Sequence, residues 1–258
     1  MRTANRLASL AFVLLAASAC ASASLEVPVE TPIKPKIDVS QFSRVYVAGF
    51  VAGGSEDVDG NLESVRLIRN QLKNKSHLKV IDADVLQLME AAERTPAAGV
   101  TITDAAGPGT GFPKAVKDDS DLKAYDPLFA NTGYWKRIGE EMQGALIVTG
   151  SVMFTPHSTQ GYVQKEQEVY DTFGRRQVVP VRTYMERKGF ILRPKFIFID
   201  GRTGAVIYTE TFREEVLYAA DQASPALSTY FELMDRVVPA FLSTLSSQSI
   251  RGTRTLLR

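Results

Sequence analysis

The chain has 258 residues, which is enough for one sizeable domain or two small ones with a buried core. Its composition is 45% hydrophobic and 23% charged, and this balance excludes a disordered or fibrous body. The formal net charge is +1, so no global excess of positive charge points to nucleic acid as a partner.

The first twenty residues have the order of a bacterial export signal. Arg2 and Arg6 form a basic start, an apolar run covers Leu7 to Ala17, and small residues lead to Cys20. The run is too short to cross a bilayer core of roughly 30 Å as a helix. Cys20 is the only cysteine and stands where signal cleavage belongs, so no disulfide partner competes for it.

This segment resembles the lipobox of bacterial lipoproteins. The resemblance implies that residues 1–19 are a signal peptide and that lipid chains on Cys20 attach the mature protein to a membrane. Ala21 and Ser22 follow the cysteine without an aspartate, which in enterobacterial lipoproteins implies the outer membrane, facing the periplasm. The alternative is an ordinary signal peptide, cut near residues 19–23, that leaves a spare thiol.

The mature chain is expected to have three parts. Residues 20–40 carry three prolines and no clear period, which predicts an extended, lipidated tether reaching roughly 60 Å. Residues 41–250 are expected to form a single periplasmic domain of the α/β (α+β) class, with helices packed on a mixed sheet and a C-terminal helix. Residues 251–258 form a basic tail that either is solvated or contacts anionic lipid, glycan or a partner.

The first half of this domain predicts alternating strands and helices. Expected in chain order are a strand at 44–50, a helix capped by Asn61 and ending near Lys75, a short strand at 78–84 and a helix at 83–94. Residues 95–132 break the pattern and predict a long Gly/Pro-rich loop, which is usually disordered or functional.

The second half predicts a helix near 134–142 and a strand at 144–154 that is buried on both faces. Residues 162–190 predict a long, solvated β-hairpin that turns near Phe173 and Gly174. Its charges fall on both parities, so neither face is expected to contact lipid. A second hairpin is expected at 190–212, and Ser224 with Pro225 begins an amphipathic helix kinked at Pro239.

No motif meets the spacing that a metal or nucleotide site demands. Asp57, Asp59 and Asn61 alternate, but an EF-hand loop needs glycine and glutamate where Leu62 and Ile68 stand. The stretch "GPGTGFPK" at 107–114 lacks the Gly-Lys-Ser/Thr of a phosphate loop. We therefore expect no metal and no cofactor.

Catalytic chemistry is equally unsupported by the sequence. His77 and His157 are the only histidines, and neither has a second ligand at metal-binding spacing. No Gly-x-Ser-x-Gly nucleophile motif is present, and adjacent carboxylates such as Glu140 and Glu141 are typical of a solvated surface. The expectation is a protein without enzymatic activity.

The order of these motifs resembles a superfamily of periplasmic lipoproteins. The stretch "RVYVAGF", the segment "LKNKSHLKVIDADVLQLMEAAE", a strand at 144–152 and "FIDGRTGAVIYTE" match its successive strands and helices. Members of the superfamily include the curli secretion lipoprotein CsgG, the lipoprotein activators of penicillin-binding proteins and the N-terminal domain of TolB. The resemblance spans residues 42–212 and implies a domain whose task is to bind other envelope proteins.

The expected function is a lipid-anchored assembly or accessory protein of the cell envelope. Its expected partner-binding surfaces are the 95–132 loop and the charged hairpin, since loops on rigid scaffolds carry recognition. The basic residues proposed for this role are Arg175, Arg176, Arg182, Arg187 and Lys188. One alternative is a homo-oligomeric ring or secretion-channel subunit, and another is an envelope hydrolase.

Overall fold

The structure is a computed structural model that describes residues 24–94, 113, 115–170, 172–219, 222 and 224–257. Within these residues the chain forms two compact units. The larger unit, Lys36–Ser246, holds the main sheet and the helices of the described residues, and we call it the domain. The smaller unit is a two-stranded ribbon made from segments near both ends of the chain.

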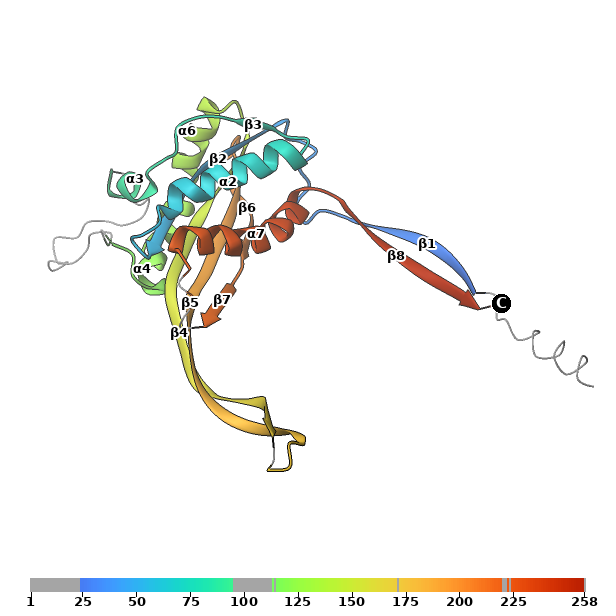
Figure 1. Cartoon of the computed structure of the whole chain (residues 1–258). Coiled ribbons are helices and arrows are strands. Elements are labelled where there is room, and N and C mark those ends of the chain that lie inside the picture. The colour runs from blue at the N-terminus through green and yellow to red at the C-terminus, as the bar shows by residue number, and fades with distance from the viewer. Residues whose placement is uncertain are drawn as a thin grey trace, which may run out of the picture. The chain divides into compact units, whose positions relative to one another are not determined.

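The domain is built on a mixed sheet with the strand order β3-β2-β4-β5-β6, and β7 also pairs with β5 (Figure 1). Strand β2 runs parallel to β3 and β4, whereas β5 is antiparallel to β4, β6 and β7. The strands are β2 Arg44–Gly54, β3 Lys79–Ile81, β4 Leu146–Tyr170, β5 Arg176–Asp200, β6 Val206–Thr211 and β7 Glu214–Ala219. The expected mixed sheet with helices packed on it is confirmed.

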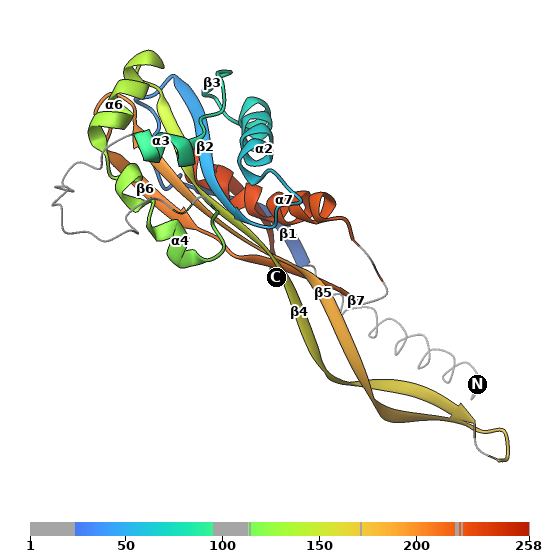
Figure 2. The same ribbon diagram turned by 90° about the vertical axis from the view of Figure 1, so that its left-hand side faces the viewer.

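Helices cover both faces of this sheet. Helices α2 (Gly60–Lys75) and α7 (Ala226–Leu245) lie on one face. Helices α3 (Leu88–Arg94), α5 (Asp126–Phe129) and α6 (Thr132–Glu141) lie on the other, as Figure 2 shows for α3 and α6. Even-numbered residues at the start of β4, such as Val148 and Val152, point into the first core, and odd-numbered ones, such as Ile147 and Met153, into the second. This central strand is therefore buried on both faces, as its apolar run predicts.

Helix α2 begins earlier than the sequence suggested. Its N-cap is Asp59, whose carboxylate accepts a hydrogen bond from the backbone N–H of Leu62, so Asn61 is not the cap. Asn61 instead lies buried in the first turn, where its side chain accepts from Phe50 N at 2.8 Å and donates to Leu86 O at 3.2 Å. Asp59 therefore caps the helix, and Asn61 fastens it to β2.

Helix α7 confirms the expected amphipathic C-terminal helix. Val237 and Phe241 are buried on its inner face, and the helix continues through Pro239. Tyr230 is fully buried and lies with its hydroxyl 2.5 Å from Ser64 Oγ, which ties α7 to α2. Burial raises the pKa of Tyr230 far above its ordinary value, so the hydroxyl stays protonated and donates to Gly60 O.

The loop expected at 95–132 is only partly a loop. Residues 95–112 and 114 lie outside the described residues, but the rest contains α4 (Asp119–Lys123) and α5. A reciprocal capping box between Asp118 and Asp121 begins α4. The composition did not predict this helix because Asp and Ser disfavour the interior of a helix, although they are preferred at its N-cap.

The spacer expected at 20–40 contains a strand. Strand β1 (Ser24–Ile33) pairs with β8 (Gln248–Leu257) over ten antiparallel residue pairs, and we call this pair the terminal ribbon. Glu30 and Arg251 are cross-strand partners whose side chains form an ion pair of 2.6 Å. The basic tail expected at 251–258 is accordingly part of a strand up to Leu257.

Within the domain, a hydrogen bond joins the two segments that lead into the terminal ribbon. Ile37 N donates to Thr244 O at 3.1 Å, close to the first residue of the domain and to the end of α7. Lys36 also forms an ion pair with Glu210, whose second oxygen accepts from Thr244 Oγ1 at 2.9 Å. No helix among the described residues is long and apolar enough to cross a membrane.

Candidate partner-binding surface

Strands β4 and β5 extend far beyond the sheet as a two-stranded hairpin (Figure 2). Their register is unbroken from Leu146 opposite Asp200 to Tyr170 opposite Arg176. Strand β2 stops pairing with β4 at Phe154, and β7 covers β5 only up to Arg187. We call residues 156–190 the hairpin. Each arm measures about 50 Å of strand, so the feature expected at 162–190 is confirmed as a projection of the core strands.

Large apolar side chains are exposed along this hairpin. Phe173 at the turn is 82% exposed and Tyr162 is 75% exposed. The others on the hairpin are Val169, Tyr170, Val178 and Tyr184. Among the described residues, the only other exposed large hydrophobic side chains are Ile33 on β1, Val206 and Ile207 on β6, and Leu227 on α7. A concentration of exposed aromatic groups is typical of an interaction surface.

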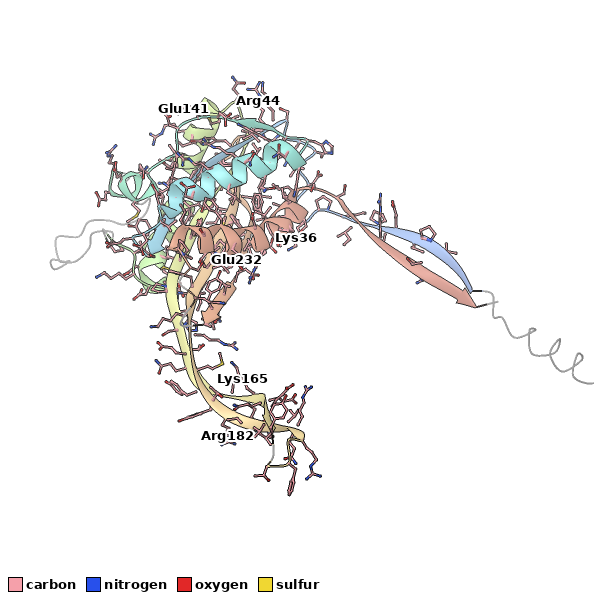
Figure 3. The ribbon with its side chains drawn as sticks, in the orientation of Figure 1. Lys36, Arg44, Glu141, Lys165, Arg182 and Glu232 are labelled. Carbon is pink, nitrogen blue, oxygen red and sulfur yellow. The ribbon has the colours of Figure 1, made fainter. Side chains whose placement is uncertain are left out.

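The basic residues proposed from the sequence all lie on the β5 arm or at the turn, but they do not converge on one site. Arg175 places its guanidinium 5.6 Å from the ring centroid of Phe173. Arg176 forms an ion pair with Glu168, and Lys188 Nζ lies 3.1 Å from Glu186 Oε1. Arg182, shown in Figure 3, and Arg187 form no ion pair in the described part of the chain. These cations are therefore spread along an extended strand.

The register sorts the charges of the hairpin between its two faces. Every cross-strand pair joins two even-numbered or two odd-numbered residues, so each parity forms one face. The even face carries most of the charged side chains, namely Glu166, Glu168, Arg176, Arg182, Glu186 and Lys188. On the odd face, from Gly161 to Val169 and from Gln177 to Met185, the only charged side chain is Lys165 (Figure 3).

Valines dominate the odd face of the hairpin. Val163, Val179, Val181 and Met185 are half-buried there by contact with one another and with their neighbours along the strands. The even parity carries tyrosines as well as charges, and Tyr162 packs edge to face against Tyr184. The sequence alone suggested solvated charges on both faces, whereas the register gives one aliphatic face and one face of charges and tyrosines.

A pocket of about 570 Å³ lies at the base of the hairpin. It is lined by Pro156, His157, Ser158, Lys188, Gly189, Phe190, Tyr218, Gln222 and Ser224. His157 Nε2 lies 3.5 Å from Glu215 Oε1 on β7, and the Tyr218 hydroxyl donates to Glu232 on α7. Since β7 and the start of α7 build one wall, only their packing against β5 creates the pocket, and no sequence motif marks it.

Among the described residues, no group of three or more His, Cys, Asp or Glu side chains comes together in a way that could hold a metal ion. Lys188 and His157 are the only basic side chains among the residues lining the pocket, and each lies close to a carboxylate, Glu186 and Glu215 respectively. Cys20, the predicted lipidation site, and the loop segment 95–112 lie outside the described residues.

Fold and surface together define an α+β domain that carries a long, partly apolar β-hairpin. No protein-family model matches the sequence, and no curated protein matches it. Among solved structures, the chain is similar to the PelC dodecamer from Paraburkholderia phytofirmans, with 14% identity, a TM-score of 0.35 and coverage of 86% of this chain and 98% of that one. It is also similar to lipoprotein GNA1162 from Neisseria meningitidis, with 10% identity, a TM-score of 0.34 and coverage of 77% and 97%.

Proposed function

We propose that this protein is a non-enzymatic accessory or assembly factor of the bacterial cell envelope, which binds other envelope proteins through its hairpin. The observation that carries the proposal is the exposure of aromatic side chains on the part of the hairpin beyond β7, which no other described element covers, with Phe173 at its end. Leaving such groups in water forgoes roughly 1.5–3 kcal/mol each relative to burial, which favours a partner that covers them.

The composition of the hairpin suits protein recognition. Binding energy at protein interfaces concentrates in Trp, Tyr and Arg, and the hairpin carries Tyr162, Tyr170 and Tyr184 together with several arginines. Charges of both signs lie beside the tyrosines on the even face, which favours a protein partner with matching charges over a uniformly charged polymer.

The decisive experiment replaces the hairpin and leaves the domain intact. Residues 160–186 are exchanged for Asn-Gly, so that Thr159 and Arg187, which are cross-strand partners, flank a tight two-residue turn. In-cell crosslinking and pulldown then compare this variant with the wild-type protein. The variant should remain folded, with an unchanged thermal midpoint, and should lose the crosslinked envelope partners. If the truncated variant keeps the same partners, then the hairpin is not the surface that binds them.

Localisation is tested separately through the predicted lipid anchor. Replacing Cys20 by Ala should give an unprocessed precursor or a chain without lipid, and the protein should leave the outer-membrane fraction. Metabolic labelling with an alkyne fatty acid measures the lipid directly. If the variant is processed and fractionates like the wild type, then the lipobox interpretation is wrong, and an ordinary signal peptide explains residues 1–19.

One observation favours a homo-oligomeric ring as the second candidate. The outer half of the β4 arm carries Glu166 and Glu168, whereas the β5 arm carries Arg176, Arg182, Arg187 and Lys188, so the two arms differ in charge. Head-to-tail contacts between copies would match these arms. Native mass spectrometry of detergent-extracted protein separates the candidates, because a single closed stoichiometry supports the ring and a monomer supports the accessory factor.

An envelope hydrolase is the third candidate function. Incubation of purified protein with peptidoglycan, peptide and ester substrates tests it by product release. If the wild-type protein turns over a substrate and His157→Ala does not, then the pocket at the hairpin base is an active site and the non-enzymatic proposal is wrong.

A further inference from the structure

The two long edges of the hairpin differ in their capacity to accept another strand. In an antiparallel pair, alternate residues point their backbone N–H and C=O groups toward the partner strand or away from it. Phe154 O accepts a hydrogen bond from Ser55 N at 2.7 Å, so this even-numbered residue of β4 points away from β5. Pro194 O accepts from Phe212 N at 2.9 Å, so the even-numbered residues of β5 likewise point away from β4.

This orientation continues to the turn because the register has no break. On β4, the backbone groups of every second residue from Ser158 to Tyr170 therefore point outward. All of these residues are exposed, and no described strand pairs with β4 on its outer side beyond Phe154. Pro156 precedes them, at the point where pairing with β2 has just ended. The β4 edge from Ser158 to Tyr170 thus presents an uninterrupted row of donors and acceptors, and we call it the open edge.

The opposite edge, on β5, is interrupted. Its outward positions are the even-numbered residues from Arg176 to Glu186, and Pro180 lies in their middle without a backbone N–H. Strand β7 covers the remainder from Arg187 to Leu192. Proline on an edge and a short covering strand are two means by which proteins prevent unwanted pairing. The hairpin is therefore protected on the β5 edge and unprotected on the β4 edge.

We propose that the open edge binds an extended strand of a partner polypeptide by β-augmentation. This inference rests on the proposed function and specifies its partner. The unpaired ladder requires extended backbone, which a folded helix or a lipid headgroup does not supply. A second copy joined head to tail is disfavoured, because it would have to use the β5 edge that Pro180 interrupts.

The side chains beside the open edge indicate the sequence of that strand. On the even face it would lie beside Glu166, which has no ion pair within the described residues, and beside Glu168. On the odd face it would lie beside Val163 and Val169. An incoming strand with basic residues on one face and aliphatic residues on the other matches both sides.

The test uses a fluorescein-labelled peptide of about nine residues that alternates lysine and valine. Fluorescence anisotropy measures its binding to the full domain with the hairpin. Gln164→Pro removes one outward N–H from the open edge, and Gln164→Ala, which keeps that N–H and loses only the side chain, is the matched control. Gln164→Pro should weaken binding about tenfold, and Gln164→Ala should leave it unchanged.

A second arm needs no protein variant. A peptide methylated at alternate backbone nitrogens keeps its side chains but cannot complete the ladder, so it should bind at least about tenfold more weakly. A glutamate-valine peptide should also bind more weakly, because it faces Glu166. Equal binding of the methylated peptide, or equal binding to Gln164→Pro, would overturn the inference.

Amide hydrogen exchange identifies competing occupants. In the free protein, the even-numbered amides from Ser158 to Tyr170 should exchange quickly, and their odd-numbered neighbours slowly. Protection of the even amides that grows with protein concentration would assign the edge to a second copy and overturn the proposal. If hairpin truncation abolishes envelope crosslinks while Gln164→Pro retains them, then the proposed function stands and this inference fails. If truncation changes nothing, the proposed function fails, whatever the peptide does.

Discussion

Tyr162 and Tyr184 face each other across the hairpin, with ring centroids 5.4 Å apart and ring planes at 68°. They are direct cross-strand partners, and the Tyr184 hydroxyl donates to Gln160 Oε1 at 2.8 Å. Such an edge-to-face pair stabilises two exposed strands that have no covering layer. It holds the hairpin together midway between the sheet and the turn.

Replacing Tyr184 by Ala should loosen the hairpin and leave the domain unchanged. The loss of the aromatic pair costs about 0.5–1 kcal/mol locally, because both rings are already largely exposed. Amide exchange of the odd-numbered residues of the β4 arm should accelerate, with no change in the thermal midpoint of the domain. Tyr184→Phe keeps the ring contact and loses only the hydrogen bond to Gln160, so its exchange rates should stay close to those of the wild type.

Phe173→Ser should lower partner capture without lowering stability. The ring is 82% exposed, so its removal forfeits little folded-state burial. A partner that buries the ring would lose about 1.5–3 kcal/mol of binding free energy. Quantitative crosslinking yield measures this loss. Val206→Ser, at a similarly apolar but separate exposed site on β6, is the control, and an equal loss there would contradict a specific role for the turn.

Gly189→Ala should detach β7 from the base of the hairpin. A Cβ at Gly189 would lie 1.9 Å from Val216 O, so the two strands would have to separate. Overpacking of this kind costs about 1–3 kcal/mol. Chemical denaturation measures the change, and amide exchange should show loss of protection in β7. Gly161→Ala on the β4 arm meets no atom within 4 Å and should be nearly neutral.

The ion pair between Asp200 and Arg202 at the β5–β6 turn is expected to make a pH-dependent contribution to the free energy of unfolding. The Arg202 guanidinium donates to both carboxylate oxygens, at 3.0 and 2.8 Å, and holds the pKa of Asp200 below its ordinary value of 3.8. A lowered pKa means that the stabilisation is fully present above about pH 4 and is lost as the pH falls through the lowered pKa.

Arg202→Gln should therefore lower the free energy of unfolding at neutral pH, but only modestly, because the guanidinium is half exposed and solvent screens the ion pair. The difference from the wild type should shrink as the pH falls below about 4. Urea denaturation at a series of pH values measures it. A difference that grows with acidity would contradict the ion pair as its source.

The local sequence pattern was sufficient to predict the core strands and the presence of the hairpin. The apolar run at Leu146 to Phe154 and the first charged stretch form one continuous strand, β4, and β5 likewise joins the second charged stretch to the core, so the sequence predicted strand in both parts but not their continuity. Gly174 has φ +75° at the turn, where glycine is favoured. The sequence predicted Asn61 as the N-cap of α2, whereas the structure has Asp59. Both residue types are good N-caps, and Asn61 uses its side chain in a tertiary hydrogen bond with Phe50 N instead.

The features that sequence reasoning missed depend on distant pairing. Val27 and Val29 are half-buried and alternate with exposed Pro28 and Glu30, which is a strand pattern. The prolines argued against a strand in the sequence. Pro28 and Pro32 are both even-numbered, however, so the backbone positions without an N–H lie on the same edge of β1. The pocket at the hairpin base was likewise invisible, because β7 meets β5 only through antiparallel pairing that no motif records.

The hydrogen bond from Ile37 N to Thr244 O has a kinetic consequence for the terminal ribbon. In an unfolded chain, pairing β1 with β8 would close a loop of about two hundred residues at a high entropic cost. Once the domain has folded, this bond holds the two lead-in segments together, and the remaining loop is a few residues. The ribbon should therefore form last and quickly after the domain has folded, and Ile37→Pro, which removes the donating N–H, should slow its formation.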